Sequence, residues 1–121
     1  EPSIAAMAAI RADETDIKNI LTACENTEKL LLANKNHAEK DIAFHTAIAL
    51  SSKNIVVPKL VPIINSSIPL IRESAKFTMR DETIEIHREI ADAIAAHDAV
   101  RAHDAMYLHL IYNRKHIKSI N

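Results

Sequence analysis

The chain of 121 residues contains no glycine. Glycine is the residue that adopts positive φ angles freely, so a chain without it is poorly suited to the tight turns of β-hairpins. Glycine-rich loops that bind phosphate are excluded for the same reason. Alanine, isoleucine, leucine, glutamate and lysine dominate the composition instead, which favours helices. The sequence therefore predicts an all-α fold.

Charge and cysteine content narrow the class of protein. Fifteen lysines and arginines stand against 16 aspartates and glutamates, so the net charge of -1 lacks the basic surplus of a domain that binds nucleic acid by itself. The single cysteine permits no disulfide within the chain and favours a reducing compartment, so we expect a cytoplasmic protein. No apolar run approaches the ~20 residues of a membrane span, and the length predicts one domain, residues 1–121.

Apolar periodicity predicts about six helices joined by short connections. The expected ranges are 2–10, 14–34, 37–51, 55–77, 82–95 and 99–118, with a loop at 78–81. The fourth range contains three prolines that should bend the helix, namely Pro58, Pro62 and Pro69. Because short connections favour antiparallel packing of consecutive helices, the predicted architecture is an antiparallel helical bundle.

Helix starts are marked by polar residues. Asp13 and Asp98 are the expected N-caps of the second and the last helix. Asn36 and Glu39 have the spacing of a capping box, which predicts the start of the third helix. Asn54 is the expected cap of the fourth.

Seven histidines exceed what packing ordinarily requires, and three of them occupy related positions. Asp41 and His45 are separated by one helical turn, so both project from one face of one helix. His87 and His109 lie equally far along the sequence from Asp98, which is expected in the turn between two antiparallel helices. At 1.5 Å per residue, each lies roughly 16 Å from that turn, at the same height in the bundle. The four side chains can therefore converge.

Burying three imidazoles and a carboxylate is costly unless a partner compensates for the lost water. A divalent metal would do so, and this donor set suits zinc or nickel first, with manganese, iron and cobalt as alternatives. We therefore predict that Asp41, His45, His87 and His109 bind one divalent metal. His116 is a less favoured substitute for His109.

The other histidines and the cysteine are expected to have ordinary roles. His37 is predicted to be solvated in the first turn of its helix, His97 to lie in a turn and His103 to lie off the apolar stripe. Cys24 lies on the apolar stripe of the second helix and is predicted to be a small buried hydrophobic residue. The chain contains neither Glu-x-x-His nor His-Glu-x-x-His, so a di-iron carboxylate site and a zinc-protease site are not expected.

Three segments together resemble a known family. They are EPSIAAMAAIRADETDI at the start, EKDIAFHTAIALSSKN around Asp41 and His45, and IHREIADAIAAHDAVRAHDAMYLHL from His87 to His109. They are similar to the first helices, the Asp-x-x-x-His helix and the last helical hairpin of the FadR C-terminal domain family. The chain departs from the family pattern at His97, where glycine is usual.

The resemblance implies a fold and a function. The family is the effector-binding half of bacterial GntR-type transcription regulators, an antiparallel bundle of six or seven helices. Many members hold a divalent metal through the four residues that match and bind a small carboxylate beside it. By resemblance, a winged helix-turn-helix domain would precede residue 1, contact with DNA would be made only by that domain, the protein would be a homodimer, and the chain would not be an enzyme.

The charge of the predicted site agrees with an anionic effector. A divalent ion with one aspartate and three neutral histidines keeps a formal charge of +1, and a metal that prefers six ligands has positions left for a small carboxylate. Arg72 and Asn65, beside the apolar stripe of the fourth helix, are candidates for orienting it. Two alternatives remain at this point: a metal-dependent hydrolase, and a helical dimerisation module whose histidines bind no metal.

Overall fold

The computed structural model describes residues 2–66 and 80–120, without the side chains of 64, 65 and 112–120. These ranges contain helices and turns and no strand, so the predicted all-α fold is confirmed. The helices are α1 (Pro2–Arg11), α2 (Glu14–Leu32), α3 (Ala38–Ser51), α4 (Val57–Ser66), α6 (Arg80–Ala95) and α7 (Ala99–Ile120). Within the described part of the chain, no helix is both long enough and apolar enough to cross a membrane.

Three helix starts differ from the sequence prediction, and the start of α3 differs by only one residue. The fourth helix begins at Val57 rather than 55, and its described part ends at Ser66 with Pro62 inside it. The expected continuation to residue 77, including Pro69, lies outside the described residues. The predicted loop at 78–81 is wrong at its end, because α6 already begins at Arg80. Asp81 in the first turn of α6 favours this earlier start, since a negative charge there interacts well with the helix dipole.

The helix caps largely follow the sequence. Asp13 caps α2 in a reciprocal capping box, in which it accepts a 2.8 Å hydrogen bond from the Asp16 N–H and its own N–H donates to the Asp16 side chain. Asp98 caps α7 by accepting from the Arg101 N–H at 3.1 Å. At α3 the N-cap is His37 rather than Asn36. The Asn36 side chain nevertheless accepts a hydrogen bond from the backbone N–H of Ala38, the first residue of the helix.

The chain turns without glycine by placing other residues at positive φ. Asn34, Lys53 and His97 have φ angles of 56°, 60° and 56°, each just after the end of a helix. An L-residue in this region costs roughly 1–2 kcal/mol. At His97 part of that cost is offset, because the imidazole Nδ1 lies 2.8 Å from the carbonyl oxygen of Ala9, in the last turn of α1. The turn between α6 and α7 is thereby fastened to α1.

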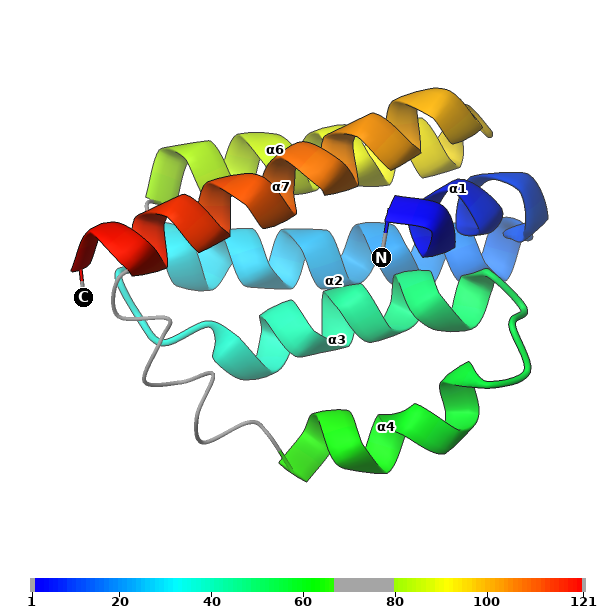
Figure 1. Cartoon of the computed structure of the whole chain (residues 1–121), viewed down its shortest axis with the longest axis horizontal. Helices are drawn as coiled ribbons and strands as arrows, with labels where there is room; N and C mark the ends of the chain where they lie inside the picture. The colour runs from blue at the N-terminus through cyan, green and yellow to red at the C-terminus, as the bar shows by residue number, and fades with distance from the viewer. Residues whose placement is uncertain (1, 67–79, 121) are drawn as a thin grey trace.

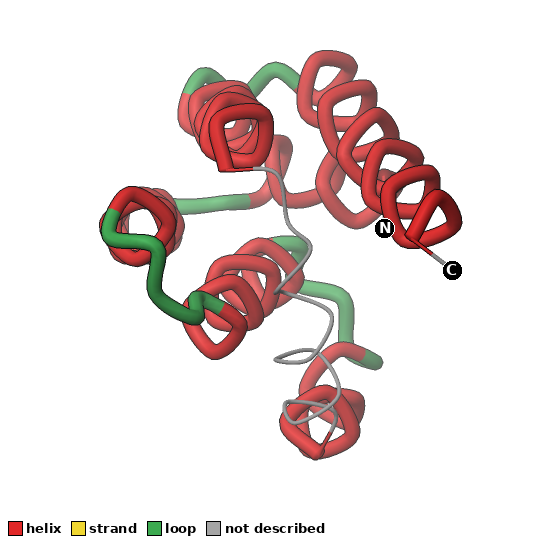
Figure 2. The backbone as a smooth tube through the Cα atoms, turned by 90° about the vertical axis from the view of Figure 1, so that its left-hand side faces the viewer, coloured by secondary structure: helices red, strands yellow, loops and turns green. Residues whose placement is uncertain are grey.

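The helices form an antiparallel bundle in which α6 and α7 make a hairpin (Figure 1). α1 packs against α7 and also contacts α3 and α6, while α2 contacts α3 and α6. α4 contacts α3 and lies at the edge of the bundle, as the end-on view also shows (Figure 2). This arrangement brings the inner faces of α3, α6 and α7 together.

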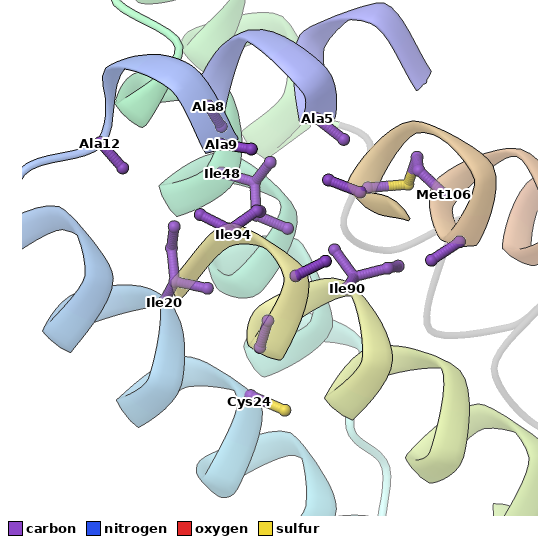
Figure 3. Packing of buried hydrophobic residues seen from close by; sticks show 14 of the residues in the cluster. Ala5, Ala8, Ala9, Ala12, Ile20, Cys24, Ile48, Ile90, Ile94 and Met106 are labelled. Atoms are coloured by element: carbon purple, nitrogen blue, oxygen red, sulfur yellow. The ribbon is translucent and has the colours of Figure 1, made fainter. Parts of the chain in front are cut away.

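In the core, α1 contributes only alanines, whereas α2, α3, α6 and α7 also contribute larger side chains such as Ile20, Ile48, Ile90, Ile94 and Met106 (Figure 3). Ala5, Ala8 and Ala9 are fully buried, which allows α1 to approach its neighbours closely. Cys24 is a buried free thiol, so the prediction for it is confirmed. On α2, Leu21 is 37% exposed, whereas Thr27 is buried. The Thr27 hydroxyl donates a 2.9 Å hydrogen bond to the carbonyl oxygen of Ala23.

Candidate metal centre

Four side chains from three helices meet inside the bundle. They are Asp41 and His45 of α3, His87 of α6 and His109 of α7. The Nε2 atoms of His45 and His87 each lie 3.3 Å from Asp41 Oδ1. The Nε2 atom of His109 lies 3.3 Å from that of His45. The ligating nitrogens of the three histidines all lie within 4.8 Å of one another, which is close enough for one ion to contact all three.

Helix geometry explains why these side chains meet. Asp41 and His45 follow each other by one turn of α3, so they share a face. The turn around Asp98 brings α6 and α7 side by side, and His87 and His109 then lie at the same height, as the sequence spacing predicts. Their ring centroids are 4.9 Å apart.

Phe44 is a neighbour of the site that the sequence reasoning did not identify. Its ring is fully buried, with its centroid 4.7 Å from that of His87 and 5.4 Å from that of His45. Such contacts restrict the rotation of both imidazoles. The sequence held a signal for it: Phe44 lies three residues after Asp41 and four before Ile48, a spacing that places it on their face of α3.

Two polar atoms of the site are buried without a hydrogen-bond partner. They are Asp41 Oδ1 and His87 Nε2, which lie close together but not in hydrogen-bonding geometry. An unsatisfied buried polar atom costs roughly 1–3 kcal/mol, and more if it is charged. A cation between these atoms would satisfy both. This is the observation of the structure that best fits a metal ion.

The protonation states also suit a metal. Burial lowers the pKa of His87 to about 3 and that of His109 to about 4, so both imidazoles are neutral at physiological pH. Burial acts to raise the pKa of Asp41, but the attraction of His45 and the other two imidazoles outweighs it, and the pKa stays below its usual value. Neutral imidazole and ionised carboxylate are the forms that bind metals.

A cavity of about 600 Å³ adjoins the site. Asp41, His45 and His109 form part of its wall, and the rest is lined mainly by apolar side chains from α1, α3, α4 and α7. His87 does not line the cavity and lies behind the other three. A small molecule in the cavity would therefore meet the site from the side of α3 and α7.

The remaining sequence predictions have different outcomes. Arg72 lies outside the described residues, as do the side chains of Asn65 and His116. The prediction that His37 is solvated is wrong: its side chain is buried at the N-terminus of α3, and burial lowers its pKa. The His37 ring hydrogen-bonds to the backbone of Lys35, which holds it against the protein although residues 32–36 before it are exposed. His103 is exposed, as expected.

Comparisons with known proteins agree with the helical fold. The FCD domain family matches residues 1–111. The uncharacterized HTH-type transcriptional regulator YcbG of Bacillus subtilis (strain 168) is 29% identical over 117 residues, which cover 97% of this chain and 49% of that protein. The solved structure of Streptococcus agalactiae GntR is similar with a TM-score of 0.80 and 34% identity, covering 95% of this chain and 53% of that one.

The chain thus spans about half the length of the relatives it matches. The Bacillus subtilis relative carries the name of a transcriptional regulator. The helical architecture, the matched residues 1–111 and the similar solved structure lead to one assignment. The chain belongs to the FCD domain family.

Proposed function

We propose that this chain is the effector-sensing domain of a GntR-type transcription regulator and that it holds one divalent metal through Asp41, His45, His87 and His109. The observation that carries the proposal is the convergence of the three imidazoles with the Asp41 carboxylate, which lies 3.3 Å from two of them; two of these polar atoms are buried without a hydrogen-bond partner. Family membership supports the regulatory role, and the donor set supports the metal.

The donor set fits a borderline transition metal. Three imidazoles and one carboxylate favour zinc or nickel, with cobalt, manganese and iron as alternatives, whereas calcium and magnesium prefer oxygen ligands. A divalent ion bound here would keep a formal charge of +1 and would supply open coordination positions to an anion. Asp41 provides the only formal negative charge among the four ligands.

Each ligand has a distinct place. His87 is the most deeply buried, and its ring packs on Phe44, so it is the fixed side of the site. His45 and Asp41 are half-buried and border the cavity together with His109. This asymmetry leaves one side of the site facing the cavity, where the effector would bind.

The effector in this proposal is a small organic acid. Its carboxylate would occupy the cavity beside Asp41, His45 and His109, which is the polar end of an otherwise apolar space. Arg72 and Asn65 remain candidates for contacting the same carboxylate.

Regulation of transcription would also need a DNA-binding domain, in the half of the relatives' length that this chain does not cover. In the proposal, a winged helix-turn-helix domain that precedes residue 1 binds DNA, and the FCD domains of two chains form a homodimer. The effector then alters DNA binding by favouring one arrangement of the two domains. Such a regulator works in the bacterial cytoplasm.

A zinc competition titration tests the metal site. The chain, stripped with a chelator and dialysed, should compete with a coloured zinc indicator for one equivalent of zinc. His45→Ala should lower zinc affinity at least tenfold, because it removes one of the four ligands. The variant should still fold, because the His45 side chain is only half-buried. His103→Ala, an exposed histidine of α7, is the matched control and should leave the affinity unchanged. Equal zinc affinity in all three proteins would contradict the proposal.

A further inference from the structure

The cavity beside the candidate metal centre is more specific than a site for any small acid. Resting on the function proposed above, we propose that the effector is a monocarboxylate with an apolar body, such as a branched, medium-chain or aryl-substituted acid. Dicarboxylates, tricarboxylates and polyhydroxy acids are excluded from this class. The inference concerns the part of the cavity that lies away from the four ligands.

The polar groups of the cavity are concentrated at one end. Apart from Asp41, His45 and His109, the described residues that line it include only two with polar side chains, Thr46 and Asn54. The Asn54 side-chain oxygen already accepts a 3.0 Å hydrogen bond from the Val56 N–H. No lysine or arginine occurs among these described lining residues. The described wall thus has one place for an anion and no second cationic group.

The remaining wall is apolar and comes from four helices. Ile4 of α1, Ile42 of α3, Leu60 of α4 and Met106 of α7 represent the four sides. Leu60 is 44% exposed, so an apolar occupant would remove hydrophobic surface from water that the fold leaves uncovered. Met106 adds a flexible side chain that adapts to branched or aromatic shapes.

The size of the cavity argues against the smallest acids. About 600 Å³ lies within the range of pockets that enclose drug-sized molecules. Acetate or lactate would fill only the polar end and would leave the apolar wall in contact with water. A second carboxylate or a row of hydroxyl groups would lose its hydration against the apolar part of that wall, which offers no hydrogen bonds in return. An apolar body gains affinity from the same surface.

Isothermal titration of the zinc-loaded chain with matched acids tests this inference. Affinity should rise roughly fourfold for each added methylene group from propanoate to hexanoate, because about 0.8 kcal/mol is gained per buried methylene group. Hexanoate should bind at least tenfold more tightly than adipate, which has the same carbon chain and a second carboxylate. Citrate and gluconate should bind more weakly than hexanoate.

Two variants separate the cavity wall from the metal centre. Leu60→Asn changes the apolar wall at a partly exposed position and should reduce hexanoate affinity at least fivefold while zinc binding stays the same. Val100→Asn is the control, since Val100 is 73% exposed on α7 and does not line the cavity. Circular dichroism verifies that both variants are folded.

The outcomes distinguish this inference from the proposed function. Tighter binding of adipate, citrate or gluconate than of hexanoate by the zinc-loaded chain would overturn the inference and leave the proposed function standing. Equal hexanoate affinity in Leu60→Asn and wild type, or no affinity for any of these acids, would overturn it as well. Failure of the chain to bind zinc at all would overturn the proposed function itself.

Discussion

Acidification should destabilise the metal-free chain through its buried imidazoles. Burial lowers the pKa of His87 to about 3 and that of His109 to about 4, whereas both have a pKa of about 6.5 in the unfolded chain. Between these values the unfolded state binds protons that the folded state does not bind, so the free energy of unfolding falls as the pH drops. The stabilisation is complete above about pH 6.5 and is lost progressively below it.

The loss can be calculated at about pH 5.5. There the two folded imidazoles are still almost entirely neutral, so the result depends on the pKa in the unfolded chain. One pH unit below 6.5 removes about 1.4 kcal/mol per histidine, or about 3 kcal/mol for His87 and His109 together. Asp41 adds nothing in this window, because its carboxylate is ionised in both states. This loss is a large share of the free energy of unfolding of a small domain, which is roughly 5–15 kcal/mol.

Urea unfolding followed by circular dichroism, with a chelator present at about pH 7.5 and about pH 5.5, measures this loss. His87→Gln should reduce the loss by about 1.4 kcal/mol, because it removes the contribution of one buried imidazole. His103→Gln, at an exposed position, should behave as wild type. A wild-type free energy of unfolding that is the same at both pH values, or a loss in His87→Gln as large as in wild type, would refute the reasoning.

Four further predictions follow from the fold and the site. Removing the metal with a chelator at neutral pH should lower the melting temperature, because a ligand present at a hundred times its Kd stabilises by about 2.7 kcal/mol; an unchanged melting temperature by scanning calorimetry would contradict this. His97→Ala should destabilise the chain by about 1 kcal/mol relative to His97→Gly, because both variants lose the hydrogen bond to Ala9 but only alanine keeps the cost of positive φ; equal urea midpoints would count against that account. The chain alone should not select one DNA sequence over another, given its net charge of -1, and selective retention of a duplex in fluorescence anisotropy at moderate salt would be the opposite result. Sedimentation should show self-association at high concentration, and a monomer at every concentration would exclude a dimer formed by this chain.

Local rules were sufficient to predict much of the architecture. The caps at Asp13 and Asp98 follow from side-chain chemistry that acts within three residues, and the structure confirms both. The convergence of His87 and His109 follows from equal distances to one turn, because the rise of a helix is constant. Asp41 and His45 are a fixed pair on any helix. The spacing thus predicted the grouping of four side chains that the structure brings together.

Other features depend on contacts between distant segments, which periodicity does not contain. His37 is buried although residues 32–36 before it are exposed, whereas its position in a first helical turn predicted a solvated side chain. The role of Phe44 beside two imidazoles needs the relative rotation of α3 and α6. His97 adopts positive φ without being glycine because Ala9, far away in the sequence, accepts a hydrogen bond from its ring.

The cavity is a further example of a feature that the sequence alone did not reveal. Its wall combines residues from α1, α3, α4 and α7, and its volume depends on how far α4 stands from the other helices. The sequence indicated a bent proline-containing helix near the site, but the apolar character of the cavity appears only when Ile42, Leu60 and Met106 are seen to face one space. The proposed preference for an apolar acid therefore rests on the structure and not on the sequence.

Native mass spectrometry of the chain, purified without added metal and without chelator, tests the central claim most directly. The account predicts one divalent transition-metal ion per chain in the wild-type protein. A variant with Asp41→Asn, His45→Ala and His109→Ala should carry no such ion. A wild-type mass without metal, or the same metal content in the variant, would contradict the claim that these residues form a metal centre.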